Sequence, residues 1–300
     1  MKRFLDYVEI KTKITSLFAF LMSLAYLFYR GQSISWLNTV VFFASMFIFD
    51  LTTTAINNYI DTKTNDQVLQ FGRKTALAII YAMFAVSMVL GLYLVYLTDI
   101  VVLLLGGLCF ITGVLYTYGP VPISRQPLGE LLSGVFYGFF IPLIMFYINL
   151  PKGTLISLGL SWDRISLDIA VAPLTALLLL SVSPVCVTAN IMLANNICDV
   201  EKDIKVKRFT LPYYLGRKSL QLFASLYYLC YTAVILMVIL GILSPVCLLV
   251  LLTLIPVQKN INVFRAQQVK AETFITSIKN FVIIMGSISA LIFASALIRL

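Results

Sequence analysis

Long apolar runs alternate with short polar segments along the whole chain. Each run is close to the roughly 20 apolar residues that cross a bilayer as one helix, although the run after Ser244-Pro245 is shorter than the others. The pattern therefore predicts an all-α integral membrane protein that forms a single transmembrane domain over residues 1–300. About nine transmembrane helices are expected, near residues 14–30, 36–60, 75–97, 100–118, 128–148, 170–197, 219–241, 244–257 and 276–299.

The composition supports this prediction. Hydrophobic residues make up 60% of the 300 residues, charged residues only 12%, and the mean hydropathy is +0.97. Soluble domains carry roughly 25% charged residues, so most of this surface is expected to face lipid. The first apolar run is not followed by a small-residue cleavage site, and we therefore expect it to stay in the protein rather than act as a removable signal peptide.

The basic residues are divided unequally between the two sets of alternate loops. Eighteen of the 22 lysines and arginines lie on the side of the N-terminus, and the other side holds Arg30, Lys152, Arg164 and Arg299. Because positively charged loops stay in the cytoplasm, the N-terminus and the loops on its side are predicted to be cytoplasmic. This topology accounts for most of the net charge of +9, so the charge does not indicate nucleic-acid binding.

Two residue types exclude several kinds of chemistry. The chain has no histidine, which excludes histidine-ligated zinc or haem and a Ser-His-Asp triad. Its five cysteines are scattered and form no CxxC pair. Four of them lie in apolar runs, where a free cysteine behaves as a small hydrophobic residue, so neither disulfides nor a metal cluster is expected.

A short polar motif occurs twice. Residues 57–61 read NNYID and residues 195–199 read NNICD, and each copy ends a long apolar run and precedes a charged loop. The copies end the second and sixth runs, so the repeat period is four helices. We therefore predict two similar four-helix halves with one extra helix, the half-repeats covering roughly 14–148 and 170–299, that place both polar helix ends at the same membrane face.

The spacing inside the motifs favours a metal site. Positions four apart share one face of a helix. Asn57 and Asp61 therefore lie on the same face of one helix, and Asn195, Asp199 and Asp203 lie in a row along one face of the other. Such rows of amide and carboxylate oxygens suit Mg²⁺, which prefers oxygen ligands and often links carboxylates to substrate phosphates. One DxxxD motif is usually only a solvated helix end. Two copies at one face, each with an Asn-Asn pair in an otherwise apolar helix, favour a functional site.

Asp50 lies inside the second apolar run, seven residues before Asn57 and on the same helical face. A carboxylate at this depth either lines a functional cavity or pairs with a polar neighbour such as Thr53 or Thr54. The sequence leaves both interpretations open.

At these residues the sequence resembles the UbiA superfamily of membrane prenyltransferases, and within it the branch that prenylates 1,4-dihydroxy-2-naphthoate. Residues 195–216, NNICDVEKDIKVKRFTLPYYLG, are similar to that branch's Asn-Asn pair, spaced aspartates, basic residue, Thr-Leu and closing Leu-Gly. Residues 116–134, YTYGPVPISRQPLGELLSG, resemble its Tyr-Thr-x-Gly-Pro and Leu-Gly-Glu segments.

The first motif departs from the family pattern. Asn57-Asn58 stands where the family usually has Asn-Asp, and Asn65, followed by Asp66, stands at the position of the distal aspartate. Arg73 and Lys74 lie in positions similar to the basic residues that follow this motif in the family.

The resemblance implies transfer of a polyprenyl group from an isoprenyl diphosphate to an aromatic ring, with Mg²⁺ on the diphosphate. Asp61, Asp199, Asp203 and Tyr118 would be catalytic. The implied metal ligands are Asn57, Asp61, Asp66, Asn195, Asp199 and Asp203. The implied diphosphate-binding residues are Lys63, Arg73, Lys74, Lys205, Lys207 and Arg208. Asp50, Asn58, Tyr59, Tyr116 and Asn196 would line the cavity, where Tyr59, Tyr116 and Tyr118 would shield an allylic cation. Lys259, Arg265 and Lys270 are attributed to topology alone.

Two alternatives stay open from the sequence. A sister prenyltransferase would use the same metal chemistry on 4-hydroxybenzoate, homogentisate, haem or chlorophyllide. A transporter with repeated halves would also carry polar residues within its helices, although its sites are expected near the middle of the membrane rather than at one face.

Overall fold

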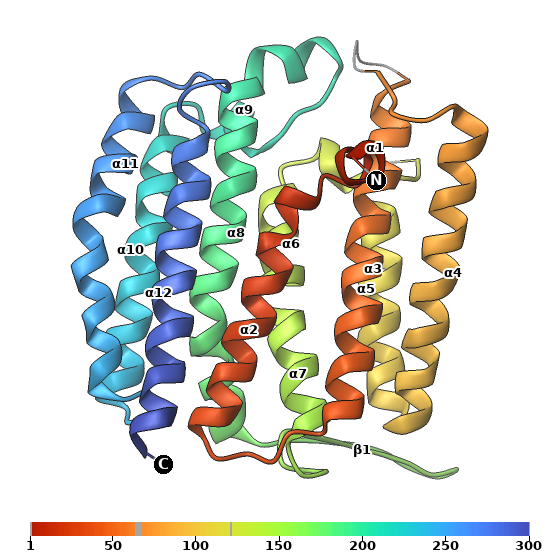
Figure 1. Ribbon diagram of the computed structural model, residues 1–300, viewed down its shortest axis with the longest axis vertical. Coiled ribbons are helices and arrows are strands. Elements are labelled where there is room, and N and C mark those ends of the chain that lie inside the picture. Colours follow the sequence, from red (N-terminus) through yellow and green to blue (C-terminus); the bar gives the residue numbers. More distant parts are fainter. Residues whose placement is uncertain (1, 64–67, 121, 300) are drawn as a thin grey trace.

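The computed structural model of the chain describes residues 2–63, 68–120 and 122–299. Within these residues, nine helical segments are long and apolar enough to span a membrane, which confirms the predicted fold class. They run side by side along the long axis of the molecule (Figure 1). The segments are Ile10–Tyr29, Trp36–Asp61, Arg73–Leu97, Ile100–Thr117, Gly129–Asn149, Val171–Lys205, Lys218–Ile239, Pro245–Ala266 and Ile275–Ile298.

The segments correspond to named helices and a few irregular turns. The long helices are α2 (Ile14–Tyr29), α3 (Trp36–Asp61), α4 (Arg73–Leu97), α5 (Ile100–Thr117), α8 (Val171–Lys205), α10 (Lys218–Ile239), α11 (Leu254–Ala266) and α12 (Ile275–Arg299). The fifth span joins α6 (Gly129–Val135), a π-helical turn (Phe136–Phe140) and α7 (Ile141–Asn149). The short elements are α1 (Lys2–Tyr7), α9 (Leu211–Leu215), β1 (Ile156–Leu160), β2 (Ile165–Ile169) and 3₁₀ helices at Ile10–Lys13, Ile123–Arg125 and Pro245–Thr253.

Two spans are longer than the apolar runs that predicted them. The sixth continues to Lys205, so Asp199 and Asp203 both lie on α8. The eighth continues to Ala266 rather than ending near residue 257, although its last turns are polar. Polar side chains on these turns find partners on neighbouring helices, because Asn260 Nδ2 donates to Asn280 Oδ1 at 2.8 Å and Tyr228 Oη donates to Gln258 Oε1 at 2.6 Å.

A close helix contact lies at the centre of the bundle, where the fifth span crosses α8. A β-carbon placed on Gly138, in the π-helical turn, would lie 2.2 Å from the Val185 backbone nitrogen and 2.6 Å from the Pro184 carbonyl carbon. A β-carbon on Gly134 would lie 2.7 Å from the Val185 carbonyl oxygen. Small residues four apart let helix backbones approach in membranes. The two glycines therefore fix the position of α8 against α6.

We expect Gly138→Ala to destabilise the protein. The new methyl group would clash with backbone atoms, and backbone atoms cannot move aside by a change of side-chain rotamer. Overpacking of this kind costs about 1–3 kcal/mol. The midpoint of thermal unfolding in detergent measures the effect.

Gly286→Ala is the matched control. Gly286 also lies within a helix, but the nearest atom to its added β-carbon is Phe18 Cε1 at 3.8 Å, an ordinary contact. This variant is expected to unfold at or above the temperature of the unmodified protein, because alanine favours a helix over glycine. Equal midpoints for the two variants would show that the contact at Pro184 is not tight.

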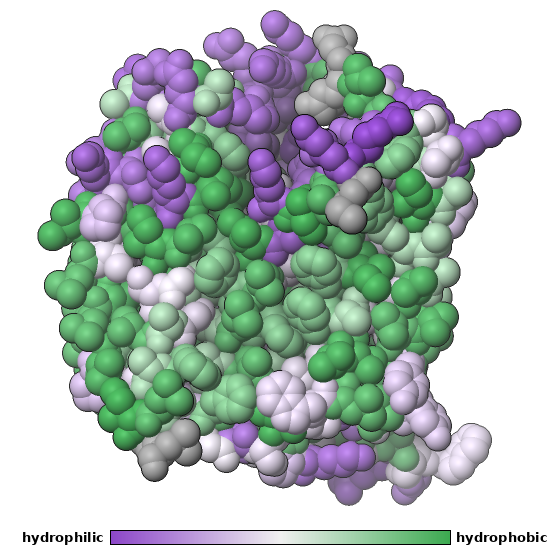
Figure 2. Space-filling view, viewed as in Figure 1, coloured by the Kyte–Doolittle hydropathy of each residue, from purple (hydrophilic) through white to green (hydrophobic). Residues whose placement is uncertain are grey.

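The surface divides into a broad apolar belt and two polar ends (Figure 2). The end that carries α1 and α9 is the more hydrophilic, and a strip of hydrophilic residues reaches from it into the belt on the face shown. The opposite end carries the hairpin of β1 and β2. The functional site therefore has to be sought where polar residues enter the apolar belt.

Candidate active site

One large cavity, about 1140 Å³ in volume, begins at the hydrophilic end and continues between the helices. Five predicted metal ligands line it together: Asn57 and Asp61 from the end of α3, and Asn195, Asp199 and Asp203 from the end of α8. The deeper wall is mostly apolar and aromatic, with Phe49 and Phe110 stacked at a centroid distance of 4.0 Å. The structure thus brings the two repeated motifs to one chamber that also has apolar walls.

The carboxylates of α8 contact basic side chains from two other segments. Lys270, between α11 and α12, forms an ion pair with Asp199. Asp203 Oδ2 lies 3.8 Å from Arg208 Nε. This carboxylate oxygen is buried and accepts no hydrogen bond among the described residues. The expectation that Lys270 serves topology alone is wrong, since its side chain reaches a motif carboxylate.

The polar end of α3 is connected to its neighbours. Asn57 Oδ1 accepts a hydrogen bond from Thr117 Oγ1 at the end of α5, and Asp61 lines the cavity. Asn58 Nδ2 donates to the Tyr7 carbonyl oxygen at 2.9 Å. Asn58 therefore fastens α1 to α3 in addition to lining the cavity.

Several residues implied by the resemblance lie elsewhere. Lys63 and Arg73 place their charges over the Tyr59 ring at 5.1 and 5.3 Å, and Arg73 also donates to the Tyr59 and Thr62 carbonyl oxygens. Tyr118 is 64% exposed. In the described part of the chain the cavity is not lined by Tyr59, Lys63, Arg73, Lys74, Tyr118, Asn196, Lys205 or Lys207. Asp66 and Asn65 lie outside the described residues.

Arg208 is the member of the predicted basic set that lines the cavity, and it is joined there by Arg125, Lys202 and Lys270. The guanidinium of Arg208 is held in place by the Ser124 carbonyl oxygen at 2.9 Å and by Asn196 Oδ1 at 3.4 Å. The basic lining of the chamber therefore differs from the set that the motifs implied.

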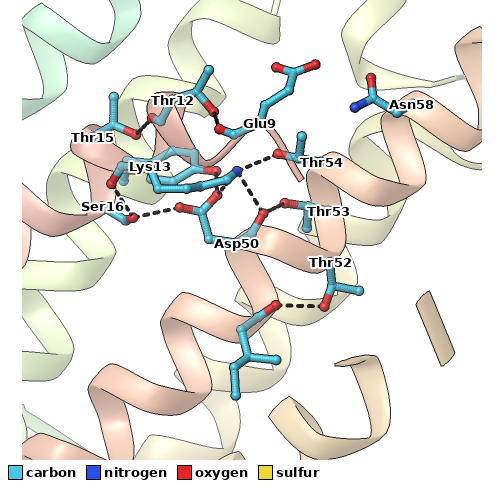
Figure 3. Close-up of polar contacts among 12 residues, drawn as sticks. Glu9, Thr12, Lys13, Thr15, Ser16, Asp50, Thr52, Thr53, Thr54 and Asn58 are labelled. Carbon is cyan, nitrogen blue, oxygen red and sulfur yellow. Dashed lines mark hydrogen bonds and ion pairs between the residues drawn. The ribbon is translucent and has the colours of Figure 1, made fainter. Parts of the chain in front are cut away.

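A second polar cluster surrounds Asp50, deeper along the same wall (Figure 3). Lys13 Nζ donates to Asp50 Oδ1 at 2.8 Å, and the two side chains are only 5% and 4% exposed. Ser16 Oγ donates to Asp50 Oδ2 at 2.6 Å, and Tyr137 Oη donates to Asp50 Oδ1 at 2.7 Å. Asp50 therefore lines the cavity and is also paired, with Lys13 as its charged partner. Thr53 Oγ1 donates to the Asp50 carbonyl oxygen at 3.0 Å.

A third group of polar contacts links the second motif to α6. Asn196 is 1% exposed, and its Nδ2 donates to Glu130 Oε1 at 2.7 Å. Glu130 Oε2 is buried and has no hydrogen-bond partner among the described residues. Asn196 is thus a buried link between Glu130 and Arg208, rather than a lining residue.

Comparison with known sequences agrees with this geometry. The sequence profile of the UbiA prenyltransferase family matches residues 16–282, which include both motifs and almost all of the helices. The chain belongs to the UbiA prenyltransferase family. The resemblance that was seen in the two motif segments therefore extends over most of this UbiA protein.

Individual relatives add detail. The 1,4-dihydroxy-2-naphthoate octaprenyltransferase of Bacillus subtilis (strain 168) is 33% identical over 173 residues, which are 57% of this chain and 49% of that protein. The match thus spans about half the length of the curated relative.

Solved structures of UbiA homologues share the fold. An apo structure from Aeropyrum pernix K1 has a TM-score of 0.66 at 17% identity, covering 92% of this chain and 97% of that one. A homologue from Archaeoglobus fulgidus bound to DMAPP and Mg²⁺ has a TM-score of 0.58 at 16% identity, with 99% of both chains covered. A structure described for digeranylgeranylglyceryl phosphate synthase has a TM-score of 0.65 at 18% identity, covering 100% and 99%.

The donor atoms of this UbiA protein fit Mg²⁺. Among the described residues, no three His, Cys, Asp or Glu side chains come together as a ready cluster. Mg²⁺ does not need one, because it usually takes one or two carboxylates and completes its shell with water and substrate phosphates. The carboxylates of Asp199 and Asp203 line the cavity together and supply hard oxygen atoms of that kind, and Asp203 Oδ2 is buried and accepts no hydrogen bond among the described residues.

We expect Glu130→Ala to destabilise this UbiA protein. The change removes the acceptor of the Asn196 amide inside the bundle, and a buried donor without a partner costs about 1–3 kcal/mol. The comparison of thermal unfolding midpoints for Glu130→Ala and Glu130→Gln tests this, because glutamine keeps a carbonyl oxygen for Asn196. Similar losses in both variants would mean that the charge, and not the hydrogen bond, is what matters.

Proposed function

We propose that this protein transfers a polyprenyl group from an isoprenyl diphosphate to an aromatic acceptor, with 1,4-dihydroxy-2-naphthoate as the first candidate and demethylmenaquinol as the product of menaquinone synthesis. One observation carries the proposal: two acidic helix ends, α3 and α8, meet at the mouth of a cavity whose deeper walls are apolar. The polar mouth suits a diphosphate, and the apolar interior suits an isoprenoid tail. The naphthoate acceptor is favoured by the name of the Bacillus subtilis relative.

The residues at the mouth have distinct parts in this reaction. Asp199 and Asp203 from α8, with Asp61 from α3, would hold Mg²⁺, and Asn57 and Asn195 are amide oxygens on the same two edges. When bound, Mg²⁺ would offset the negative charge that develops on the departing diphosphate. The cationic side chains of Arg125, Lys202, Arg208 and Lys270 line the same mouth, and we assign to them the contacts with the phosphate oxygens.

The interior of the cavity fits the second half of the reaction. The bond between the allylic carbon and the diphosphate oxygen breaks with its electrons on the oxygen, and the ring carbon of the acceptor then attacks the allylic cation. With the naphthoate acceptor, the ring carbon that carries the carboxylate forms the new bond, and the bond to the carboxylate then breaks with its electrons returning to the ring as CO₂ leaves; with an acceptor that lacks this carboxylate, a ring proton leaves instead. The rings of Phe49, Phe110, Tyr116 and Tyr137 line this part of the cavity. Aromatic faces attract a cation, and apolar walls keep water from capturing it.

The acceptor is proposed to lie toward the Asp50 cluster. Lys13, Ser16, Thr54 and Tyr137 there offer hydroxyl and charged groups within an otherwise apolar wall. An aromatic ring that carries hydroxyl groups needs a few such polar contacts to fix its orientation in a pocket.

We expect turnover to require a divalent metal ion. Purified protein in lipid, given an isoprenyl diphosphate and 1,4-dihydroxy-2-naphthoate, is predicted to form a prenylated naphthoquinol with Mg²⁺ and to lose the product with EDTA. EDTA removes the metal that the acidic helix ends would hold, so excess Mg²⁺ should restore product formation. Product formation is measured by chromatography and mass spectrometry, and undiminished turnover in EDTA would overturn the metal role.

The same assay separates the other candidates. Metal-dependent release of diphosphate only with 4-hydroxybenzoate, homogentisate or another acceptor would keep the prenyltransferase proposal and change the acceptor. Uptake of a substrate into sealed vesicles, without any covalent product, would instead support a transporter.

We also propose that the mouth of the cavity faces the cytoplasm in a bacterial cytoplasmic membrane. The support is the excess of lysine and arginine in the loops at that end. Site-directed labelling of single introduced cysteines in a cysteine-free variant, applied to intact cells with a reagent that does not cross the membrane, tests this orientation.

A further inference from the structure

The hairpin of β1 and β2 separates its residues by chemical type. Its register pairs Ile156 with Ile169, Leu158 with Leu167 and Leu160 with Ile165, so all three pairs at alternate positions are apolar. The pairs between them are Ser157 with Asp168 and Gly159 with Ser166. Because successive side chains of a strand point to opposite faces, one face of the hairpin is apolar and the other is polar.

The outer part of the apolar face is uncovered by protein among the described residues, whereas Ile156 and Leu158 are half-buried and Ile156 packs against the hydrophobic core. The exposed fractions are 59% for Leu160, 75% for Ile165 and 60% for Leu167. In water, these three side chains and that of Ile169, which is 45% exposed, would form a contiguous apolar patch, and such patches usually mark a surface that binds a partner or a membrane. The regular alternation of these side chains indicates that the face is matched to an apolar partner.

The place and direction of the hairpin identify the partner. It lies across the end of the bundle that is opposite the polar mouth of the cavity, and it does not follow the helix axes (Figure 1). Its two strands connect the ends of two spanning segments, Gly129–Asn149 and Val171–Lys205. Both ends of the hairpin are therefore tethered where the apolar belt stops, at the level of the lipid headgroups.

The base of the hairpin is fixed to the bundle, which keeps it at that level. Leu155 is only 2% exposed, and the Ala170 amide donates to the Leu155 carbonyl oxygen at 3.0 Å. The tip closes on itself, since the Ser161 amide donates to the Arg164 carbonyl oxygen at 2.9 Å. Trp162, at this tip, is fully exposed, and tryptophan is enriched at membrane interfaces.

We propose that this hairpin is a lipid-binding element that lies flat in the bilayer interface, with Leu160, Ile165, Leu167 and Ile169 turned toward the acyl chains and Ile156 anchoring its base to the bundle. Ser157, Ser166 and Asp168 then face headgroups and water. The arrangement is the sheet counterpart of an amphipathic interfacial helix, whose apolar face enters about 5–10 Å into the headgroup and acyl boundary. Its partner is the lipid surface beside the bundle, continuous with the apolar belt.

Two neighbouring positions on opposite faces provide the test. The chain has two tryptophans, so Trp36→Phe with Trp162→Phe gives a tryptophan-free protein. Into this background either Leu167→Trp, on the apolar face, or Asp168→Trp, on the polar face, is introduced. Each variant is reconstituted in phosphatidylcholine vesicles whose acyl chains carry bromine close to the headgroup, and the quenching of the fluorescence is measured.

The proposal expects strong quenching and a blue-shifted emission for Leu167→Trp, and at least about twofold less quenching for Asp168→Trp, because the two side chains point to opposite sides of the interface. Equal quenching at the two positions, or none at either, would overturn it. Protection of Leu167→Trp from lipid in a species with the mass of a dimer would overturn it as well, and would assign the face to a second copy of the chain.

Discussion

Asp199→Ala is expected to lower the turnover of isoprenyl diphosphate by about 100-fold or more, the size of loss seen when one preorganised group that stabilises developing charge is removed. Asp199 lies on the cavity between Asn195 and Asp203, and it belongs to the stronger of the two acidic motifs. Removal of its carboxylate also leaves Lys270 without its ion-pair partner. The rate of metal-dependent diphosphate release, measured with saturating Mg²⁺, gives the effect.

Glu201→Gln is the matched control for this prediction. Glu201 lies on the same helix between the two aspartates, but it is exposed and does not line the cavity in the described part of the chain. The substitution removes one negative charge at nearly the same place, so a comparable loss in Glu201→Gln would mean that overall charge, rather than contact with the substrate, accounts for the effect. Thermal unfolding of both variants shows whether each is folded.

Lys13→Met is expected to destabilise the protein by about 3–5 kcal/mol, because it leaves the Asp50 carboxylate buried without its charged partner. Lys13 Nζ contacts the Asp50 carboxylate, the Asp50 carbonyl oxygen at 2.9 Å and Thr54 Oγ1 (Figure 3). A single substitution therefore removes a charge and three hydrogen bonds from a site that water barely reaches. The midpoint of chemical or thermal unfolding in detergent measures the loss.

The double variant Lys13→Met with Asp50→Asn separates the two causes. It removes both charges, so most of the lost stability should return if the uncompensated carboxylate is responsible. The kinetics of this double variant then test the acceptor proposal: the KM for the aromatic acceptor should rise while the KM for the isoprenyl diphosphate stays nearly constant. A double variant as unstable as Lys13→Met would show that packing of the lysine stem, and not the charge, carries the effect.

The spans and the acidic site could be predicted because both depend on signals local to the sequence. A helix that crosses a bilayer needs a long apolar run, and the runs ending at Asp61 and Asp199 carry amides and carboxylates that an apolar helix does not otherwise tolerate. The four-residue spacing within each motif then placed Asn195, Asp199 and Asp203 on one face. The structure agrees that all three line the cavity.

The partners of those residues could not be predicted, because they come from distant segments. Lys270 lies 71 residues from Asp199, and Lys13 lies 37 residues from Asp50. Lysines in polar loops have no periodicity, so nothing in the sequence separates one that turns inward from one that faces solvent. Arg73 shows the reverse case, since its position after the first motif suggested phosphate binding, whereas its guanidinium donates to the end of α3.

The hairpin illustrates a different limit. Its apolar residues alternate over only five positions in each strand, and in a chain that is 60% hydrophobic such short alternation is hard to distinguish from the background. The alternation becomes informative only when the pairing of Ile156 with Ile169 shows that the apolar residues of both strands lie on one face. That pairing can be seen only in the folded chain.

The ion pair between Lys270 and Asp199 has a consequence for the order of events during synthesis. Asp199 and Asp203 are made with α8, whereas Lys270 follows only after α10 and α11, immediately before α12. Until then, the acidic end of α8 lacks one of its two basic partners, and the wall to which Phe274 belongs is not yet present. The charged mouth is thus completed only after the segment between α11 and α12 has been made and has folded back onto the end of α8.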